Sequence, residues 1–84
     1  MALVTLYTTR FCPFCIRAKS LLDSKQVQYE EIRVDNNHKL REKMMKKSGR
    51  RTVPQIWIDS QHIGGCDELY GLERSGKLDG LLKV

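Results

Sequence analysis

Two cysteines separated by two residues, Cys12-Pro13-Phe14-Cys15, constrain this chain more than any other feature of its sequence. An apolar run at residues 3–8 precedes the pair, and residues 16–22 after it have the apolar spacing of a helix. The pair is therefore expected where a strand ends and a helix begins. Residues three apart on a helix have Cβ atoms about 5–6 Å apart, and a disulfide needs about 3.5–4.5 Å. A small tightening of the first turn would close or open a disulfide without moving the rest of the fold.

The two cysteines are expected to differ in reactivity. If Cys12 takes the N-cap position, Pro13 takes the first helical position, where its fixed φ suits a helix start and its missing N–H is not needed. The free N–H groups of Phe14 and Cys15 then point toward the Cys12 sulfur, and with the helix dipole they favour thiolate over thiol. Arg10 adds a positive charge just upstream. We therefore predict that Cys12 is the catalytic nucleophile and that Cys15 is the more buried, resolving thiol.

This spacing occurs both in redox pairs and in halves of zinc sites. In a chain without secretory signals, C-x-x-C beside a strand–helix–strand pattern is typical of thioredoxin-like redox proteins. A structural zinc site needs two more ligands, and the remaining candidates are Cys66, His38 and His62. These residues form neither a second C-x-x-C nor an H-x₃₋₅-H spacing. The pattern favours redox chemistry, and no metal site is expected.

The composition is that of a small cytoplasmic protein. Eighty-four residues make one domain, 1–84, with no room for a second catalytic domain. The first residues enter a strand without a signal peptide, and no apolar run is long enough to span a bilayer. Three cysteines are an odd number, which argues against a disulfide-stapled secreted scaffold. We therefore expect a cytoplasmic protein with no membrane association.

Fifteen Lys and Arg residues against ten Asp and Glu residues give the chain a net charge of +5. Such an excess can indicate nucleic-acid binding. The basic residues are spread along the chain without interleaved aromatic residues, and the densest group, residues 39–47, lies on an expected helix. We therefore predict a solvated face that steers acidic partners, and we expect no nucleic-acid partner.

The hydrophobic pattern predicts an α/β fold with the element order β-α-β-α-β-β-α. The expected strands cover residues 3–8, 29–34, 55–59 and 62–64. The expected helices start at Pro13, after the caps that Asp35-Asn36-Asn37 offer, and at Cys66. The second helix should end at Ser48-Gly49, and a last short helical piece carries Leu78, Leu81 and Leu82. The first two strands should pair in parallel through a right-handed crossover. The last two should form an antiparallel hairpin around a turn at Ser60-Gln61. The result is one mixed four-stranded sheet flanked by helices, with the first helix burying a stripe at residues 14, 18, 21 and 22.

Thr52-Val53-Pro54, directly before the third expected strand, is one candidate to complete a site. A proline at a strand start is harmless, because its missing N–H is not needed there. In the alternative, a cis Val53-Pro54 bond would turn the backbone of Val53 toward Cys12, where an extended substrate could pair with it.

Gly64-Gly65-Cys66-Asp67 is the other candidate. The glycines allow close approach of a ligand, and the N–H groups of Cys66 and Asp67 at a helix start can bind an anion. The plainer alternative is an ordinary glycine-rich turn, with Cys66 as a packed small apolar residue.

Taken together, these segments resemble the dithiol glutaredoxin family, and most of all its short bacterial-type members. The resemblance covers essentially the whole chain and includes all three motifs in order. It implies a thioredoxin fold and makes the cis form of the Val53-Pro54 bond the expected one. It also implies a monomeric, glutathione-dependent thiol–disulfide oxidoreductase. Its expected substrates are protein disulfides and glutathione–protein mixed disulfides, with glutathione as co-substrate.

The resemblance further implies a glutathione groove. The glutathione sulfur would meet Cys12, and the cysteinyl backbone would pair with Val53. The γ-glutamyl carboxylate would meet the N–H groups of Cys66 and Asp67, and Asp67 would accept from the γ-glutamyl amine. The residues implied to bind glutathione are Arg10, Phe14, Thr52, Val53, Pro54, Gly65, Cys66 and Asp67. The basic candidates for the glycyl carboxylate are Arg10, Lys39 and Arg41.

Two positions depart from the family pattern, and two other functions stay open. The family commonly has Tyr at Phe14 and Lys at Thr9, and Arg10 is a candidate to compensate for the latter. An iron–sulfur cluster carrier would use Cys12 from two chains with two glutathiones, although such carriers usually have Gly where this chain has Pro13. A thioredoxin-like protein would be reduced by a flavoprotein reductase in place of glutathione, which Thr9 leaves open.

Overall fold

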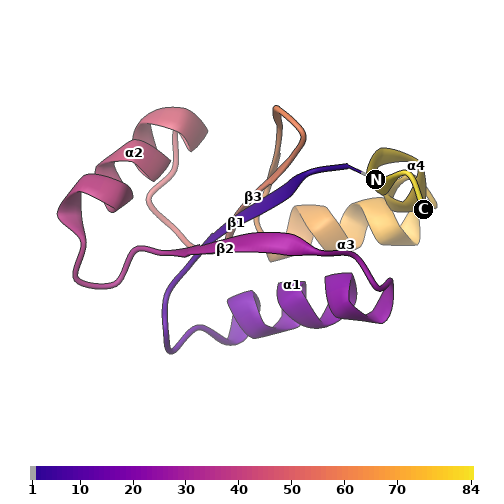
Figure 1. Ribbon diagram of the computed structural model, residues 1–84, viewed down its shortest axis with the longest axis horizontal. Coiled ribbons are helices and arrows are strands. Elements are labelled where there is room, and N and C mark those ends of the chain that lie inside the picture. Colours follow the sequence, from indigo (N-terminus) through magenta and orange to yellow (C-terminus); the bar gives the residue numbers. More distant parts are fainter. Residues whose placement is uncertain (1) are drawn as a thin grey trace.

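The computed structural model describes residues 2–84 and has the predicted order of elements (Figure 1). The strands are β1 (Val4–Thr8), β2 (Tyr29–Arg33), β3 (Gln55–Ile58) and β4 (Gln61–Gly64). The helices are α1 (Pro13–Ser24), α2 (His38–Ser48), α3 (Cys66–Arg74) and α4 (Leu78–Leu82). None of these helices is long and apolar enough to cross a bilayer.

The four strands form one mixed sheet in the order β2-β1-β3-β4. β1 pairs in parallel with β2 and antiparallel with β3, and β3 pairs antiparallel with β4. This arrangement confirms the predicted parallel pair and hairpin. The hairpin turn lies at Asp59-Ser60 and not at the predicted Ser60-Gln61, because Gln61 is already part of β4 and pairs with Ile58. Asp59 has a φ of +55°, a conformation that Asp tolerates better than most residues.

Helices cover both faces of the sheet (Figure 1). On one face, α1, α3 and α4 enclose the larger core with β1 and β3. On the other face, α2 covers a smaller core that consists of Tyr7, Val34, Met44 and Trp57. Burial on both faces explains why β1 carries apolar residues at both odd and even positions.

The predicted apolar stripe of α1 is core except at its first member. Ala18, Leu21 and Leu22 are buried in the larger core. Phe14 is 52% exposed, because it lies in the first turn of the helix, beside an open groove. Phe14 is therefore a surface residue, and the prediction that it belongs to the core was wrong.

α2 begins and ends where the sequence predicted. The side chain of its N-cap residue Asn37 accepts a hydrogen bond from the N–H of Leu40 at 3.1 Å. Gly49 ends the helix with a φ of +72°, a left-handed conformation that glycine adopts without strain. The chain can therefore turn back and enter β3 through residues 50–54.

Candidate active site

Cys12 and Cys15 lie at the start of α1, in the predicted capping arrangement. Cys12 is the N-cap residue, Pro13 is the first helical residue, and the Cys12 sulfur accepts a hydrogen bond from the N–H of Cys15 at 3.1 Å. A backbone donor in this position stabilises negative charge on the sulfur. Cys12 is 7% exposed and Cys15 is 1% exposed. Cys15 is thus the more buried thiol, as predicted.

The environment of Cys15 makes it a poor first nucleophile. Burial, and next the hydrogen bond with Cys12, raise the pKa of the Cys15 thiol to about 12. Since the thiolate is the reactive form, Cys15 keeps its proton at neutral pH. The pair is therefore chemically unequal, and its geometry favours attack by Cys12 followed by a second step at Cys15.

The turn before β3 lies beside Cys12. The Val53-Pro54 bond is cis, as expected from the resemblance, and the carbonyl oxygen of Val53 is 3.8 Å from the Cys12 sulfur. Gln55 positions this turn, because its Nε2 atom donates to the Thr52 carbonyl oxygen at 2.9 Å. Gln55 is completely buried. The sequence analysis did not single it out, although a glutamine at the start of a buried apolar strand is a signal that its amide has partners.

The start of α3 forms the other side of the site. Cys66 and Asp67 are its first two residues, and the first N–H groups of a helix have no intrahelical partners. The Glu68 carboxylate folds back and accepts a hydrogen bond from the N–H of Gly65 at 2.6 Å. Gly64 has a φ of +120°, and a Cβ atom there would lie 2.5 Å from Glu68 Oε1. Only a glycine at position 64 leaves enough space for the Glu68 carboxylate to reach the Gly65 N–H.

An ion pair connects the two sides. Arg50 Nη1 donates to Glu68 Oε1 at 2.9 Å. The hydrogen bond from Gly65 and then the one from Arg50 lower the pKa of Glu68. Neither residue of this pair was predicted from the sequence. The capping role of Glu68 could have been predicted from the sequence, because Glu68 stands three residues after the N-cap position of α3, where a capping box has Glu.

A groove of about 290 Å³ lies between these segments. Its lining residues are Phe14, Arg50, Thr52, Val53, Pro54, Gly65, Cys66, Asp67 and Glu68. Among the residues that the resemblance implied for glutathione, all but the three basic candidates for the glycyl carboxylate line this groove. The Val53 carbonyl, which contacts the Cys12 sulfur, connects the groove to Cys12.

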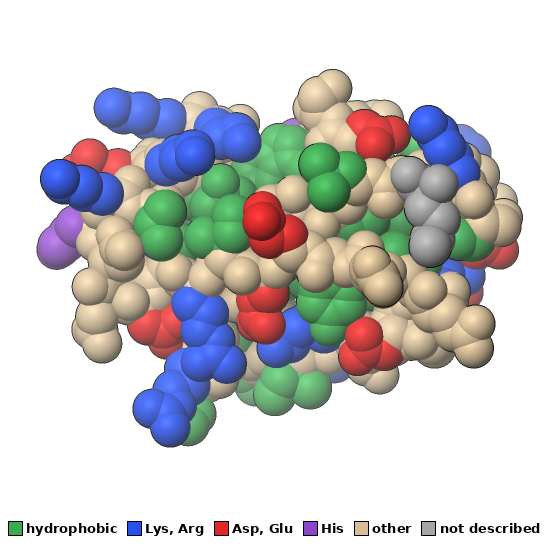
Figure 2. Space-filling model, in the orientation of Figure 1, with side chains coloured by type: hydrophobic (Ala, Val, Ile, Leu, Met, Phe, Trp, Pro, Cys, Tyr) green, Lys and Arg blue, Asp and Glu red, His purple; other side chains and the backbone are tan. Residues whose placement is uncertain are grey.

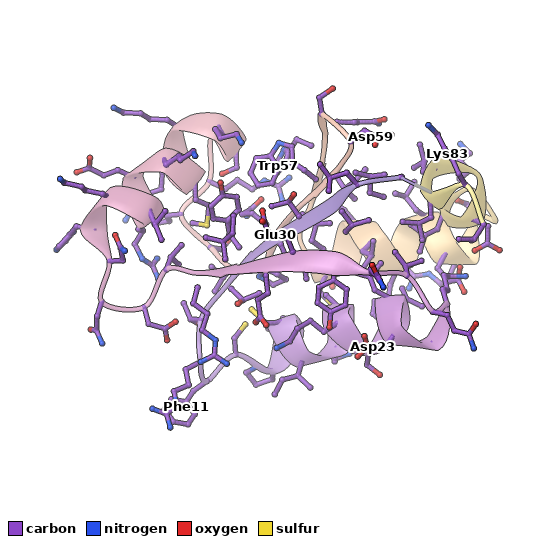
Figure 3. The ribbon with its side chains drawn as sticks, viewed as in Figure 1. Phe11, Asp23, Glu30, Trp57, Asp59 and Lys83 are labelled. Atoms are coloured by element: carbon purple, nitrogen blue, oxygen red, sulfur yellow. The ribbon has the colours of Figure 1, made fainter. Side chains whose placement is uncertain are left out.

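Arg10 is not among the residues that line this groove. The Arg10 guanidinium lies 5.3 Å from the centroid of the Phe11 ring, and the backbone N–H of Arg10 donates to Asp35 Oδ2 at 2.6 Å. Phe11 is 86% exposed, and Figure 3 shows it projecting from the loop between β1 and α1. Arg50, and not Arg10, is thus the basic residue that lines the groove.

The other two basic candidates lie on α2. Arg41 Nη1 donates to the carbonyl oxygen of Arg51 at 3.2 Å, and Lys39 is exposed. Neither residue is among those that line the groove. Their contribution is to the charge of the surface next to it.

The third cysteine is a packed residue. Cys66 is 4% exposed, and burial raises the pKa of its thiol. The Cys66 side chain therefore packs as a small apolar group. Among residues 2–84, no group of three or more His, Cys, Asp or Glu side chains is placed to hold a metal ion.

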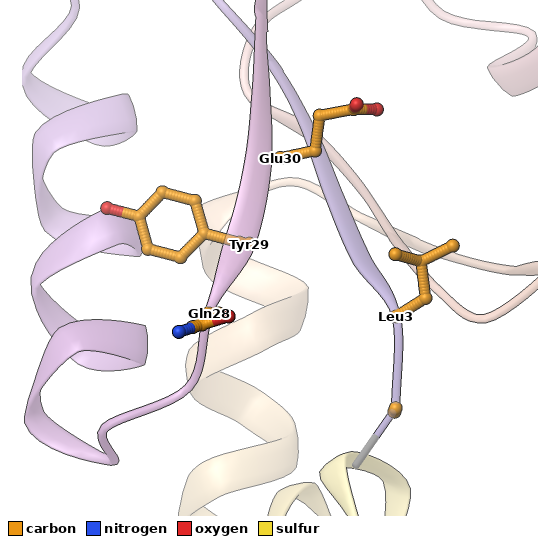
Figure 4. Close-up of a pocket in the computed structure, with 5 residues that line it drawn as sticks. Leu3, Gln28, Tyr29 and Glu30 are labelled. Carbon is orange, nitrogen blue, oxygen red and sulfur yellow. The ribbon is translucent and has the colours of Figure 1, made fainter.

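A second hollow, of about 380 Å³, lies against the start of β2 (Figure 4). Its lining residues are Ala2, Leu3, Gln28, Tyr29 and Glu30. None of these side chains is a thiol or a cation, so the hollow offers nothing to thiol chemistry.

Comparison with known proteins places this site in a family. The glutaredoxin family model matches residues 4–63. The chain is also 59% identical over 83 residues to Glutaredoxin 3 of Escherichia coli K12, which covers 99% of this chain and 100% of that protein. The chain belongs to the glutaredoxin family.

Solved glutaredoxin structures have the same fold. The solution structure of glutaredoxin from Brucella melitensis matches with a TM-score of 0.88 and 52% identity, over 99% of this chain and 90% of that one. A crystal structure of a buckwheat glutaredoxin–glutathione complex matches with a TM-score of 0.90 and 30% identity, over 98% of this chain and 77% of that one. This glutaredoxin therefore has the predicted thioredoxin fold, and its family and fold make it a thiol–disulfide oxidoreductase.

Proposed function

We propose that this glutaredoxin is glutathione-dependent and reduces both glutathione–protein mixed disulfides and protein disulfides. The observation that carries the proposal is the groove that leads from the Cys12 sulfur, past the Val53 carbonyl, to the start of α3. Glutathione has a sulfur to meet the thiol and carboxylates to meet the helix start. The groove forms within one chain, which is consistent with a monomer.

Three parts of glutathione have partners in this proposal. The glutathione sulfur lies at Cys12, and its cysteinyl backbone pairs with the backbone of Val53. The γ-glutamyl carboxylate accepts from the N–H groups of Cys66 and Asp67, where the helix dipole favours an anion. The Phe14 ring forms a wall without the hydroxyl that tyrosine would add.

The reaction with a glutathione–protein mixed disulfide needs only Cys12. The Cys12 thiolate attacks the glutathione sulfur, a Cys12–glutathione disulfide forms, and the protein thiolate leaves and takes up a proton. The thiolate of a second glutathione then attacks the glutathione sulfur of this adduct. Glutathione disulfide leaves, and the Cys12 thiolate is restored.

The reaction with a protein disulfide needs both cysteines. Cys12 attacks one substrate sulfur and forms a mixed disulfide, and the other substrate sulfur leaves as a thiolate. Cys15 gives its proton to this substrate thiolate and attacks the Cys12 sulfur. The bond between Cys12 and the substrate breaks, the second substrate sulfur leaves as a thiolate that takes up a proton from water, and a Cys12–Cys15 disulfide remains. Two glutathiones reduce this disulfide and become glutathione disulfide. Family potentials of about −200 to −230 mV suit exchange with a cytosolic glutathione pool.

The test couples turnover of a glutathionylated peptide to glutathione reductase and NADPH consumption. Wild type, Cys15→Ser and Cys66→Ser should turn over, because the mixed-disulfide reaction uses Cys12 alone. Cys12→Ser should be inactive. Turnover by Cys12→Ser would contradict the assignment of the nucleophile. Absence of turnover in wild type, with insulin disulfides still reduced through a thioredoxin reductase, would replace the proposal by a thioredoxin-like function.

A further inference from the structure

The positive charge of this glutaredoxin is concentrated in one segment. Residues 38–51 contain seven of the fifteen Lys and Arg residues and one of the ten Asp and Glu residues. The segment therefore carries a charge of +6, and the rest of the chain carries −1. Figure 2 shows these side chains gathered over α2, which also appears at the upper left of Figure 1. We call this the α2 basic surface, and its members are Lys39, Arg41, Lys43, Lys46, Lys47, Arg50 and Arg51.

Apart from Arg50, these cations form no ion pair among residues 2–84. Arg50 itself pairs with Glu68. Elsewhere the pattern is different, since Lys19 and Lys25 are each held by acidic side chains at 3.0 Å or less. The α2 basic surface thus presents an uncompensated field to the solvent.

The α2 basic surface reaches the active site. Arg41 on α2 donates to the carbonyl oxygen of Arg51 at 3.2 Å, and Arg50 itself lines the groove. The chain then passes directly into Thr52 and Val53, whose carbonyl contacts the Cys12 sulfur. The α2 basic surface is therefore continuous with the segment that contacts Cys12.

We propose that the α2 basic surface docks acidic segments of protein substrates and so selects which disulfides reach Cys12. The proposal rests on the proposed function and adds the charge of the preferred substrate. Opposite charges raise the rate of encounter and fix orientation, and this effect is lost in salt.

A polypeptide fits this surface better than a nucleic acid. Binding of single-stranded nucleic acid uses exposed aromatic rings on which bases stack. The aromatic ring beneath α2, Trp57, is 6% exposed, and Lys47 Nζ lies 5.2 Å from its centroid. Phe14, an exposed ring near this surface, lies in the groove at the start of α1 and not on α2. The reactive group next to this surface is the Cys12 thiol, which reacts with disulfides, and nucleic acids contain no disulfides.

The experiment compares two charge-reversed variants of equal net charge. Lys43→Glu/Lys46→Glu changes exposed side chains of α2 that have no ion-pair partner among residues 2–84. Arg74→Glu/Lys77→Glu is the matched control, because these residues are also exposed and Arg74 also lies in the last turn of a helix. The substrates are two glutathionylated peptides that differ only in flanking Asp or Lys residues, and glutathionylated cysteine serves as the small substrate.

At an ionic strength of about 0.01 M, wild type should have a kcat/KM for the acidic peptide about tenfold above that for the basic one. Lys43→Glu/Lys46→Glu should remove this preference, the control variant should keep most of it, and about 1 M salt should abolish it in all three proteins. All three should turn over glutathionylated cysteine equally.

Equal turnover of both peptides by wild type, or an equal loss of preference in the control variant, would overturn the docking proposal. So would tight binding of an oligonucleotide that Lys43→Glu/Lys46→Glu abolishes while the peptide preference survives. Absence of turnover of glutathionylated cysteine by wild type would instead refute the proposed function itself.

Discussion

Replacing Gly64 with Ala should destabilise the fold and push the Glu68 carboxylate away from the start of α3. Gly64 has a φ of +120°, and an added Cβ atom would lie 2.5 Å from Glu68 Oε1. Holding a non-glycine residue in such a conformation costs about 1–3 kcal/mol. Loss of the hydrogen bond from the Gly65 N–H to Glu68, a helix-capping contact, adds about 1 kcal/mol. The free energy of unfolding should therefore fall by about 2–4 kcal/mol in Gly64→Ala.

A double-mutant cycle separates the two contributions. Glu68→Ala alone should cost about 1 kcal/mol, since it removes the same cap. In Gly64→Ala/Glu68→Ala the cap is lost only once, so the double variant should be about 1 kcal/mol more stable than the sum of the single losses. Urea denaturation of all four proteins measures this difference.

Gly76 supplies the control for the cycle. It has a φ of +75°, and an added Cβ atom there would meet nothing within 4 Å. Gly76→Ala combined with Glu68→Ala should therefore be additive within about 0.5 kcal/mol. If the Gly64 cycle is equally additive, Glu68 is not the group that position 64 accommodates, and this account of the α3 start is wrong.

Two further predictions concern acid stability and thiol reactivity. A hydrogen bond from the Thr8 hydroxyl is the main cause that lowers the pKa of Glu31 below its ordinary value of 4.5, so its ionised form stabilises the fold above that pH and this contribution is lost on acidification. Glu31→Gln should therefore lose less unfolding free energy than wild type between about pH 6 and pH 3, and an unchanged loss in urea titrations would contradict this. Iodoacetamide at neutral pH should modify Cys12 before Cys15 and Cys66, because burial raises the pKa of the latter two thiols. Peptide mass spectrometry over time gives the order, and early labelling of Cys15 would reverse the assigned roles.

Local chemistry made much of the fold predictable from the sequence. The Cys12-Pro13 start of α1 and the Asn37 start of α2 follow from capping preferences that act over three or four residues. The hairpin turn lies one residue earlier than predicted. It could not be placed from the sequence, because nothing there shows that Asp59 takes a left-handed conformation.

The cation of the groove could not be predicted in the same way. Arg10 is close to Cys12 in sequence, but its stacking on Phe11 takes its charge elsewhere. Arg50 enters the groove because it pairs with Glu68, eighteen residues further along the chain. The direction of a long charged side chain depends on such distant partners, which only the folded structure reveals.

The most direct measurement of the central claim is the identity of the cysteine that carries glutathione during turnover. Cys15→Ser, which cannot form the Cys12–Cys15 disulfide, is mixed with a glutathionylated peptide, quenched with acid, digested and analysed by mass spectrometry. We expect glutathione on Cys12, in an adduct that disappears when free glutathione is added. Glutathione found on Cys66, or an adduct on Cys12 that free glutathione does not release, would contradict the claim that the groove beside Cys12 is the glutathione site.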